Sequence, residues 1–440
     1  MKRFLIAAAA VLTVAGCCRK AALHHPDWTY DSVVYEVNIR QFSPEGTFAG
    51  VEAQLPRLKD LGVDVLWLMP MYEIGSEERK GSLGSYYAIS DYCKVNPEFG
   101  TMEDFDHLLS AAHEAGFKVV LDWVANQTAP DHVWMTQRPE DYYERDSLGN
   151  AIYEYDWNDT RSLNYENEAV WASQDSCMRF WLDKGVDGFR CDAAGEMPAK
   201  FWYSILPKMN ADYPQAYLLA EAERTNLANP DSCFDATYAW ELHHILNRVS
   251  AGEESPEAIK AYLVRDAENY PETAFRLSFT SNHDENSWHG TEFERMGDAA
   301  CACAVLCFTL PKSQPLIYTG QEVGLDRRLE FFEKDPITDW SDNAYTEFFK
   351  KLVGLKHQNH ALDAGERGGS YTEIAEPDGV FAFAREKGDN KVIVAVNFND
   401  ADAPLTLLLD GKYTELFTGV EAEGEVSRTL TPGGYLVLYK

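Results

Sequence analysis

The sequence predicts an α/β protein: a (β/α)8 barrel with a short domain inserted after its third strand, followed by an antiparallel β domain. Three observations support this prediction. From about residue 33 to residue 362, short β-rich apolar runs alternate with amphipathic helical stretches, which is the pattern of parallel βα units. The spacing between the third and fourth runs exceeds what one unit needs. After residue 365 the helical stretches stop, and apolar residues alternate with polar ones.

The first 16 residues have the pattern of a leader. A basic start, Met1 to Arg3, precedes an apolar run at residues 4–15 that is too short for a stable membrane span, and Cys17 follows after Gly16. This pattern resembles the lipobox of bacterial lipoprotein signals, in which the cysteine becomes the first mature residue and carries the lipid anchor. The resemblance implies that residues 1–16 are removed, and an ordinary secretory signal cut nearby is the alternative.

We therefore expect an exported bacterial lipoprotein, anchored to the membrane through Cys17 alone. The longest later apolar run, residues 301–310, is too short to cross a membrane. Basic Arg19 and Lys20 follow the anchor, and they differ from the acidic leader that some Gram-negative bacteria use for surface display. This favours a periplasm-facing protein over one at the cell surface.

The barrel is predicted to occupy residues 17–126 and 166–362. Its strands are near-continuous apolar runs, as expected where both faces of a parallel sheet are buried. Eight candidates give eight βα units, the number in a TIM barrel. They lie near residues 33–38, 63–68, 119–122, 188–192, 216–220, 235–238, 275–279 and 316–318.

The inserted domain is predicted at residues 127–165. Strand three ends near Asp122 and strand four near Asp192, a gap of 70 residues. One βα unit needs roughly 30 residues, so about 40 are extra. This polar, aromatic-rich segment precedes the helix that leads into strand four.

The C-terminal domain is predicted at residues 366–440 as an antiparallel β-sandwich. Apolar runs at residues 380–384, 392–396 and 435–439 alternate with turns such as Gly388-Asp-Asn390.

The nine cysteines suggest neither a disulfide framework nor a metal site. They lie at positions 17, 18, 93, 177, 191, 233, 301, 303 and 307, a spacing that proposes no pairing, although export would permit disulfides. Cys301, Cys303 and Cys307 sit among Ala, Val, Leu and Phe without a nearby His. We interpret them as small apolar thiols of a buried helix.

Composition limits the class of partner. The 440 residues include 39 Lys and Arg against 71 Asp and Glu, a formal charge of −32, with 45% hydrophobic and 13% aromatic residues. Such an aromatic content excludes a disordered acidic chain. The negative charge disfavours nucleic acid and anionic lipid surfaces, and it favours a neutral or cationic partner, although a highly solvated surface explains the charge equally well.

Three acidic residues follow predicted strands. Asp192 ends strand four, Glu221 follows strand five, and Asp284 follows strand seven. The carboxyl ends of barrel strands meet at one mouth, where catalytic groups of TIM barrels lie. Each residue alone would fit a helix N-cap, but three in register, with Arg190 and His283 beside them, favour catalysis.

These segments resemble the α-amylase family of glycoside hydrolases (family thirteen). The match runs from about Val33 to Leu362 and rests on five motifs that occur in order. They are Gly62-Val-Asp-Val-Leu-Trp-Leu-Met-Pro70, Asp122-Trp-Val-Ala-Asn-Gln127, Gly188-Phe-Arg-Cys-Asp192, Ala220-Glu221 and Asn282-His283-Asp284. The family's C-terminal β domain is expected too.

The resemblance implies catalytic roles for all three carboxylates. Asp192 would be the nucleophile, Glu221 the general acid and base, and Asp284 the residue that holds sugar hydroxyls and stabilises the transition state. Glu223 is a rival for the acid. We prefer Glu221 because it directly follows the small residue that ends the strand.

The chemistry of retaining glycosidases needs one ionised and one protonated carboxyl group. We expect Arg190 to lower the pKa of Asp192, and Glu221 to stay protonated because it lies near carboxylates rather than cations.

Further substrate-binding positions come from the same resemblance. It makes Tyr87 the aromatic platform under the cleaved sugar and gives polar contacts to Asn126, Gln127, Arg190 and His283.

Three positions depart from the family pattern. Gln127 stands where the family usually has His, although an amide still donates and accepts hydrogen bonds. Glu196 resembles the neopullulanase and cyclomaltodextrinase branch, because typical α-amylases have a Lys-His pair ending at that position. Ser162 stands where a calcium-binding Asp is usual. Because Ca²⁺ needs several oxygen ligands, we expect no conserved structural calcium, no other metal and no cofactor, with Asn126 then a structural hydrogen-bonding residue.

The sequence therefore predicts a retaining hydrolase of α-1,4-linked α-glucans, either starch-like polysaccharides or maltooligosaccharides. Neopullulanase, cyclomaltodextrinase, α-glucosidase or transglycosylase activity on the same three carboxylates is the first alternative. A glycan-binding protein on an inactive scaffold is a remote one, because all three carboxylates are present. A metallohydrolase is weaker still, since no His pair with ligand spacing ends a strand.

Overall fold

The computed structural model describes residues 25–138, 141–230, 233–374 and 377–440. The predicted leader and the predicted anchor Cys17 lie outside the described residues. Within the described ranges, no helix is long and apolar enough to cross a membrane.

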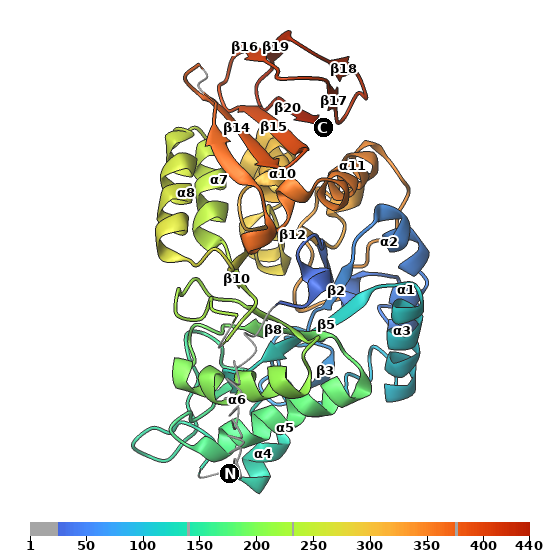
Figure 1. The fold of residues 1–440 in the computed structure, drawn as a ribbon. Coiled ribbons are helices and arrows are strands. Elements are labelled where there is room, and N and C mark those ends of the chain that lie inside the picture. Colours follow the sequence, from blue (N-terminus) through green and yellow to red (C-terminus); the bar gives the residue numbers. More distant parts are fainter. Residues whose placement is uncertain (1–24, 139–140, 231–232, 375–376) are drawn as a thin grey trace, which may run out of the picture.

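A closed barrel of eight parallel strands forms the centre of the molecule (Figure 1). Its order is β1, β2, β5, β8, β9, β10, β11 and β12, closing back onto β1, so all eight predicted strands and the fold class are confirmed. The strands are β1 (Val34–Val37), β2 (Val65–Leu68), β5 (Lys118–Val124), β8 (Gly188–Asp192), β9 (Tyr217–Ala220), β10 (Ala236–Tyr238), β11 (Phe275–Ser278) and β12 (Ser313–Tyr318).

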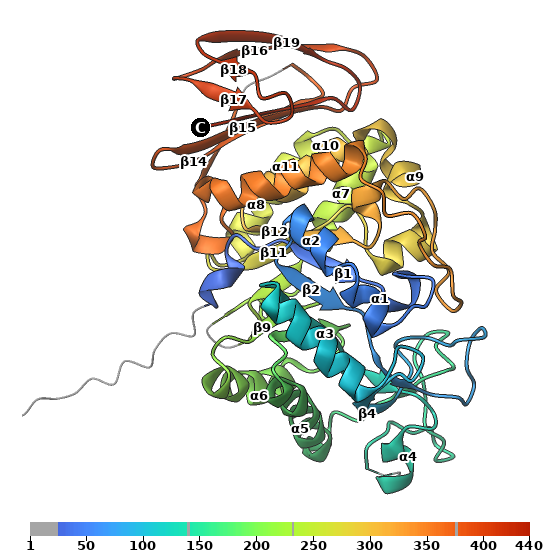
Figure 2. The ribbon, with the colours of Figure 1, turned by 90° about the vertical axis from the view of Figure 1, so that its right-hand side faces the viewer.

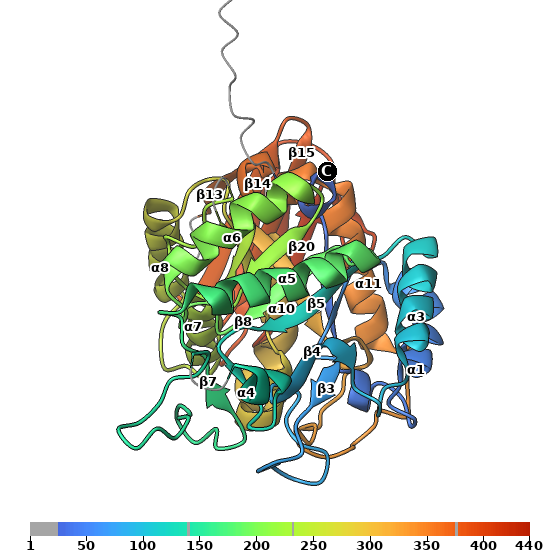
Figure 3. The same cartoon turned by 90° about the horizontal axis from the view of Figure 1, so that it is seen from below.

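Helices surround the barrel, as the view from below shows (Figure 3). They are α1 (Phe48–Glu52), α2 (Leu55–Leu61), α3 (Met102–Glu114), α5 (Glu168–Lys184), α6 (Ala199–Asp212), α7 (Trp240–Ser250), α8 (Glu257–Asn269), α9 (Glu292–Met296), α10 (Ala300–Thr309) and α11 (Ala344–Gln358). Helix α10 is largely buried. Cys303 and Cys307 lie in its apolar surroundings, as predicted, whereas Cys301 is partly exposed.

Register places polar residues at one level inside the barrel. Asp122 of β5 pairs with Arg190 of β8, and two residues later Val124 pairs with Asp192. Because side chains two residues apart on a strand share a face, Arg190 and Asp192 point to the same side. A buried polar layer therefore lies directly below the strand ends.

Two segments extend the barrel at the end away from the C-terminal domain (Figure 2). The predicted insertion contains β6 (Gln127–Thr128), α4 (Val133–Gln137) and β7 (Arg161–Ser162). A second excursion, the antiparallel pair β3 (Tyr72–Ile74) and β4 (Ile89–Val95), was not predicted. Its pairing has register shifts on both sides of Glu73, so neither strand shows a regular alternation in the sequence.

The C-terminal domain is antiparallel, as predicted. One face of its six-stranded sheet packs on the barrel helices, and there Phe381 and Phe383 join the main hydrophobic core. The other face packs on the two-stranded sheet β16–β19. The strands are β13 (Ser370–Glu373), β14 (Val380–Lys387), β15 (Asn390–Asn397), β16 (Ala403–Leu408), β17 (Tyr413–Glu415), β18 (Glu421–Ala422), β19 (Glu425–Leu430) and β20 (Tyr435–Tyr439).

Candidate active site

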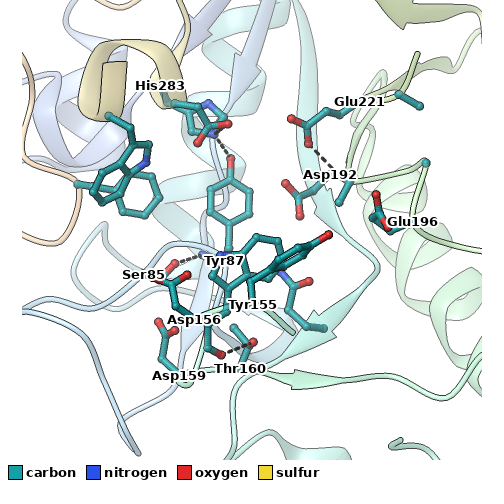
Figure 4. A pocket seen from close by; sticks show the side chains of 18 of the residues that line it. Ser85, Tyr87, Tyr155, Asp156, Asp159, Thr160, Asp192, Glu196, Glu221 and His283 are labelled. Carbon is teal, nitrogen blue, oxygen red and sulfur yellow. Dashed lines mark hydrogen bonds and ion pairs between the residues drawn. The ribbon is translucent and has the colours of Figure 1, made fainter. Parts of the chain in front are cut away.

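A cavity of about 1020 Å³ lies at the carboxyl ends of the barrel strands (Figure 4). The residue ending β8, Asp192, and the residue after β9, Glu221, line it together with Asp284 after β11. Tyr87, Gln127 and His283 also line it. The structure therefore brings together six of the eight predicted catalytic and substrate-binding residues around one space.

Arg190 lies beneath this cavity and joins its carboxylates. Its guanidinium is fully buried, with Nη1 3.0 Å from Asp122 Oδ1 and 3.0 Å from Asp192 Oδ1. Nη2 lies 2.8 Å from Glu221 Oε2. Nε donates to the hydroxyl of Tyr238 at 3.1 Å, and the guanidinium packs over Trp67. One cation thus fixes the positions of three carboxylates, and Arg190 is a positioning residue that does not itself line the cavity.

Glu221 is held through one of its two oxygens. Oε2 accepts a hydrogen bond of 2.8 Å from the backbone N–H of Ala193 and faces Arg190. Ala193 has a φ of 43°, in the left-handed region that non-glycine residues rarely adopt, and this turn after β8 aims its N–H at Glu221. Within the described residues Oε1 of Glu221 has no protein partner. It is the oxygen left for substrate.

Glu223, the rival acid, also lines the cavity but is engaged elsewhere. Its Oε1 pairs with Arg276 Nη2 at 2.6 Å, and its Oε2 accepts from the backbone N–H of Glu241 at 2.8 Å. Both oxygens are therefore occupied. The geometry favours Glu221 as the acid and gives Glu223 a structural ion pair.

His283 links the third carboxylate to the barrel floor. Its Nε2 lies 2.7 Å from the hydroxyl of Tyr87 and 3.4 Å from Asp284 Oδ2, while Nδ1 contacts the buried carboxylate of Glu36. Burial lowers the pKa of His283, but the charges of Asp284 and Glu36 outweigh burial and raise it to about 9. His283 is therefore an imidazolium at neutral pH, placed between two carboxylates.

Tyr87 forms one wall of the cavity. Its ring stacks on His283, with 5.5 Å between the ring centroids, and its hydroxyl bonds to Asp122 Oδ2 at 3.1 Å. The hydroxyl is thus held by His283 and Asp122, which fixes the ring as a rigid apolar surface.

Gln127 and Asn126 have different surroundings in the structure. Gln127 lines the cavity, and within the described residues its Oε1 lacks a hydrogen-bond partner. Asn126 does not line the cavity. Its Nδ2 lies 3.4 Å from Glu154 Oε2, and its carbonyl accepts from the N–H of Leu163, so it supports the inserted segment.

The expectation that Arg190 lowers the pKa of Asp192 is wrong, and so is the premise that no cation lies near Glu221. Arg190 does contact Asp192, but burial together with the charges of Glu221, Asp122 and Asp284 raises the pKa of Asp192 above its usual range, against the opposing effect of Arg190. Glu221 lies near a cation as well as near carboxylates. Sequence spacing did not reveal that one guanidinium is shared by several carboxylates. Burial also raises the pKa of Asp284 and of Asp122, against the opposing charges of His283 and Arg190.

Aromatic side chains that no sequence motif pointed to border the cavity on two sides. Trp288, Phe331 and Phe332 contact one another, with centroid distances of 5.3 Å between Trp288 and Phe331 and 5.1 Å between Phe331 and Phe332. Across the cavity the insertion contributes Tyr155 and Trp157, 4.7 Å apart. For Tyr155 and Trp157, the high aromatic content of the insertion was the indication in the sequence.

The residues at the position where the family binds calcium contact other groups of the protein. Asn126 contacts Glu154 through its amide, and Ser162 takes part in the short β6–β7 pairing opposite Gln127. In the part of the chain that the structure describes, no group of three or more His, Cys, Asp or Glu is arranged to hold a metal.

The raised pKa of His283 predicts a pH-dependent contribution to stability. Its stabilising charge pairs are fully present below about pH 6.5, the ordinary pKa of His, and are lost as the pH rises through about 9. We expect the melting temperature of the wild type to exceed that of His283→Gln at about pH 6, and the difference to shrink by about pH 10. A difference that stays constant over this range would contradict the assignment.

Comparison with known proteins gives consistent matches over both domains. Residues 25–357 match the model of the alpha-amylase catalytic domain, and residues 379–440 match that of a beta-galactosidase C-terminal domain. The chain is 28% identical over 439 residues to alpha-amylase MalA of Haloarcula japonica, covering 96% of this chain and 64% of that relative, which is less than two thirds of its length.

Two further matches cover different parts of the chain. An oligo-1,6-glucosidase of Bacillus cereus is 35% identical over 201 residues, which cover 38% of this chain and 35% of that enzyme. The crystal structure of an alpha-amylase from Lactobacillus plantarum superposes with a TM-score of 0.83 and 30% identity, covering 93% of this chain and 99% of the other.

Proposed function

The chain belongs to the α-amylase family of glycoside hydrolases, and on that basis we propose that it is a retaining hydrolase of α-1,4-glucosidic bonds in starch-like polysaccharides or maltooligosaccharides. One observation carries the proposal. The guanidinium of Arg190 contacts both Asp192 and Glu221, so the two carboxyl groups lie close together at one end of the cavity. Close carboxyl pairs, about 5–5.5 Å apart, are typical of double displacement, and wider pairs of inversion.

In the first step Asp192 attacks the anomeric carbon. The bond from that carbon to the glycosidic oxygen breaks, and Glu221 transfers its proton to the leaving oxygen, giving a glycosyl ester on Asp192. The free Oε1 of Glu221 is the oxygen that carries this proton, because Ala193 and Arg190 occupy Oε2.

In the second step Glu221 acts as a base. It takes a proton from water while the water oxygen attacks the anomeric carbon, and the ester bond to Asp192 breaks. Two inversions return the original α configuration. Glu221 is again protonated, so the cycle closes without a cofactor.

Neighbouring residues position the sugar during both steps. Tyr87 supplies an aromatic face, on which a sugar ring packs well, beside Asp284 and the His283 imidazolium. Asp284 is the most exposed of the three carboxylates, with 36% of its side chain exposed against 14% for Asp192 and 16% for Glu221. It is free to accept sugar hydroxyls.

A second activity on the same carboxylates is supported by two observations. Glu196 lines the cavity, as expected for the neopullulanase and cyclomaltodextrinase branch, and one relative is named an oligo-1,6-glucosidase. Neopullulanase, cyclomaltodextrinase, α-glucosidase or transglycosylase activity is therefore the alternative. A binding protein without activity is disfavoured because Asp192, Glu221 and Arg190 form an intact constellation.

A timed product profile separates these activities. The purified protein is incubated with amylose, pullulan, cyclodextrin and maltotriose, and the products are sized at intervals. We expect rapid shortening of amylose to maltooligosaccharides. Panose from pullulan, or cyclodextrin as the preferred substrate, would replace the proposal with the neopullulanase or cyclomaltodextrinase alternative, and absence of any cleavage would replace it with a binding function.

We also propose that the protein is a membrane-anchored lipoprotein and that it holds no structural calcium. The leader pattern supports export as a lipoprotein anchored through Cys17 and facing the periplasm, so Cys17→Ala should release the protein from the membrane fraction.

Because Ser162 replaces a usual calcium ligand, we expect EDTA to leave the melting temperature unchanged. Retention of the Cys17→Ala protein on membranes, or a large drop in melting temperature with EDTA that Ca²⁺ reverses, would contradict these points.

A further inference from the structure

Trp288, Phe331 and Phe332 form an aromatic wall that continues from Tyr87 along one side of the cavity. Phe331 lies nearly parallel to Tyr87, with 6.3 Å between the ring centroids and 15° between the ring planes, and its ring lies 6.5 Å from that of His283. Beyond it, Trp288 lies 5.3 Å from Phe331 and 5.8 Å from Phe332. All of these residues line the cavity. The aromatic surface therefore extends outward from the platform for the cleaved sugar.

Exposure to solvent increases along this surface. Tyr87 is 9% exposed and Trp288 is 50% exposed, and Phe331 between them is partly buried. The chain has eleven tryptophans, all within the described residues, and Trp288 alone is exposed. An exposed aromatic face that lines a cavity is typical of a surface that a ligand covers. Trp288 is therefore the part of the wall that is open to a ligand.

Hydrogen bonds fix the wall at two points. Ser287, the residue before Trp288, donates from its hydroxyl to the carbonyl of Leu329 at 2.9 Å. The N–H of Leu83, in the connection between β3 and β4, donates to the carbonyl of Phe332 at 3.1 Å. These bonds hold together three segments that are far apart in the sequence. A surface that is already ordered loses little conformational entropy when it binds a ligand.

The wall lies across the barrel mouth from the nucleophile and the acid. Asp192 ends β8 and Glu221 follows β9, whereas Phe331 and Phe332 belong to the segment after β12, which lies four strands from β8 in the closed barrel. Figure 4 shows Asp192 and Glu221 together on one side of Tyr87. Because Glu221 protonates the leaving oxygen, the leaving part of the substrate lies beside Glu221. The sugars toward the non-reducing end therefore extend to the opposite side.

We propose that Trp288 is the platform for a glucose unit on the non-reducing side of the cleaved bond, a role that rests on the proposed glucan hydrolysis. A pyranose ring has an apolar face of C–H groups that packs on an aromatic ring. Tyr87 takes the unit at the cleaved bond. Trp288 is separated from Tyr87 by Phe331, so it takes a unit farther along the chain. Trp288 thereby favours substrates with more than one glucose unit on this side.

The position of the cleaved bond tests this role. Maltoheptaose that carries ¹³C in its reducing-end glucose is digested briefly by the wild type and by Trp288→Ala, and mass spectrometry gives the lengths of the labelled and unlabelled products. We expect the variant to cleave closer to the non-reducing end, because sugars on that side lose their platform, and kcat/KM to fall at least about tenfold. A shift toward the reducing end, or an unchanged pattern and rate, would overturn the proposal.

Two variants serve as controls. Trp288→Phe keeps an aromatic face, so it should retain the wild-type cleavage pattern and most of the rate. Tyr203→Ala removes another exposed aromatic side chain, 41% exposed on α6 and outside the cavity, and it should behave as the wild type. The melting temperature of all three variants should stay close to that of the wild type, since the side chains lie at the surface. The same shift in Tyr203→Ala as in Trp288→Ala would overturn the proposal.

Binding separates this proposal from the proposed hydrolase activity. Maltoheptaose is titrated calorimetrically into the Glu221→Gln protein with and without Trp288→Ala. Binding at least about tenfold weaker in the double variant supports the platform, even if the wild type cleaves no maltooligosaccharide, a result that would refute only the hydrolase activity. Equal affinity of the two proteins, or no binding to either, would overturn the platform, whereas cleavage by the wild type would still support the hydrolase activity.

Discussion

Replacing Asp192 by Asn or Glu221 by Gln is expected to lower turnover at least about 100-fold, the scale of losing nucleophilic or acid–base assistance. Asn lacks the charge that attacks the anomeric carbon, and Gln lacks the proton that the leaving oxygen needs. Both replacements keep the shape of the side chain and its contact with Arg190, so the melting temperature should change little. Initial rates on a soluble maltooligosaccharide measure the loss.

Glu223→Gln is the matched control for the acid. Glu223 lines the same cavity, but both of its oxygens are bound, to Arg276 and to the N–H of Glu241. We expect this variant to keep turnover within about tenfold of the wild type while losing stability. Normal activity in Glu221→Gln, combined with an inactive Glu223→Gln, would reverse the assignment of the acid.

Replacing Arg190 by Met is expected to reduce both stability and activity. Arg190 and Asp122 are fully buried, so the change leaves an unpaired carboxylate inside the barrel, at a cost of about 3–5 kcal/mol. Asp192 and Glu221 lose their common partner at the same time, and small displacements of catalytic groups cost about 100-fold in rate. Chemical unfolding measures the loss of stability, and the turnover rate per folded molecule measures the loss of activity.

Two further variants separate positioning from stability. The double variant Arg190→Met, Asp122→Asn no longer contains the buried carboxylate charge of Asp122. It should therefore regain part of the stability that Arg190→Met loses, while its turnover stays low. Arg276→Met removes another buried arginine, one that pairs with Glu223 and Asp266. It should be destabilised comparably but keep most of its turnover. If the Arg190→Met variant kept normal turnover, Arg190 would have no positioning role.

The barrel could be predicted from sequence because its determinants are local. Each strand is a short apolar run with turn residues at both ends, and the family motifs fall on the strand ends, so Asp192, Glu221 and Asp284 were placed at one mouth. The β3–β4 pair was missed because its register shifts on both sides of Glu73 hide any periodicity. The elements with a regular local pattern of apolar residues could therefore be predicted, and the irregular pair could not.

Contacts that depend on barrel closure could not be predicted. Glu36 lies in the middle of β1 with no motif around it, and it meets His283 only because the ladder closes through β1 and β12. Likewise, the sequence suggests only Asp192 as a carboxylate partner of Arg190, since spacing along one strand says nothing about a carboxylate on the next.

The anomeric configuration of the first product tests the double-displacement mechanism most directly. Hydrolysis of maltotriose, or of a longer maltooligosaccharide if the shorter one is resistant, is followed by proton NMR from the first minutes, before mutarotation mixes the anomers. The close pairing of Asp192 and Glu221 through Arg190 predicts that the α-anomer appears first and the β-anomer only later. Initial release of the β-anomer would contradict the mechanism, because it would require direct attack by water without an intermediate on Asp192.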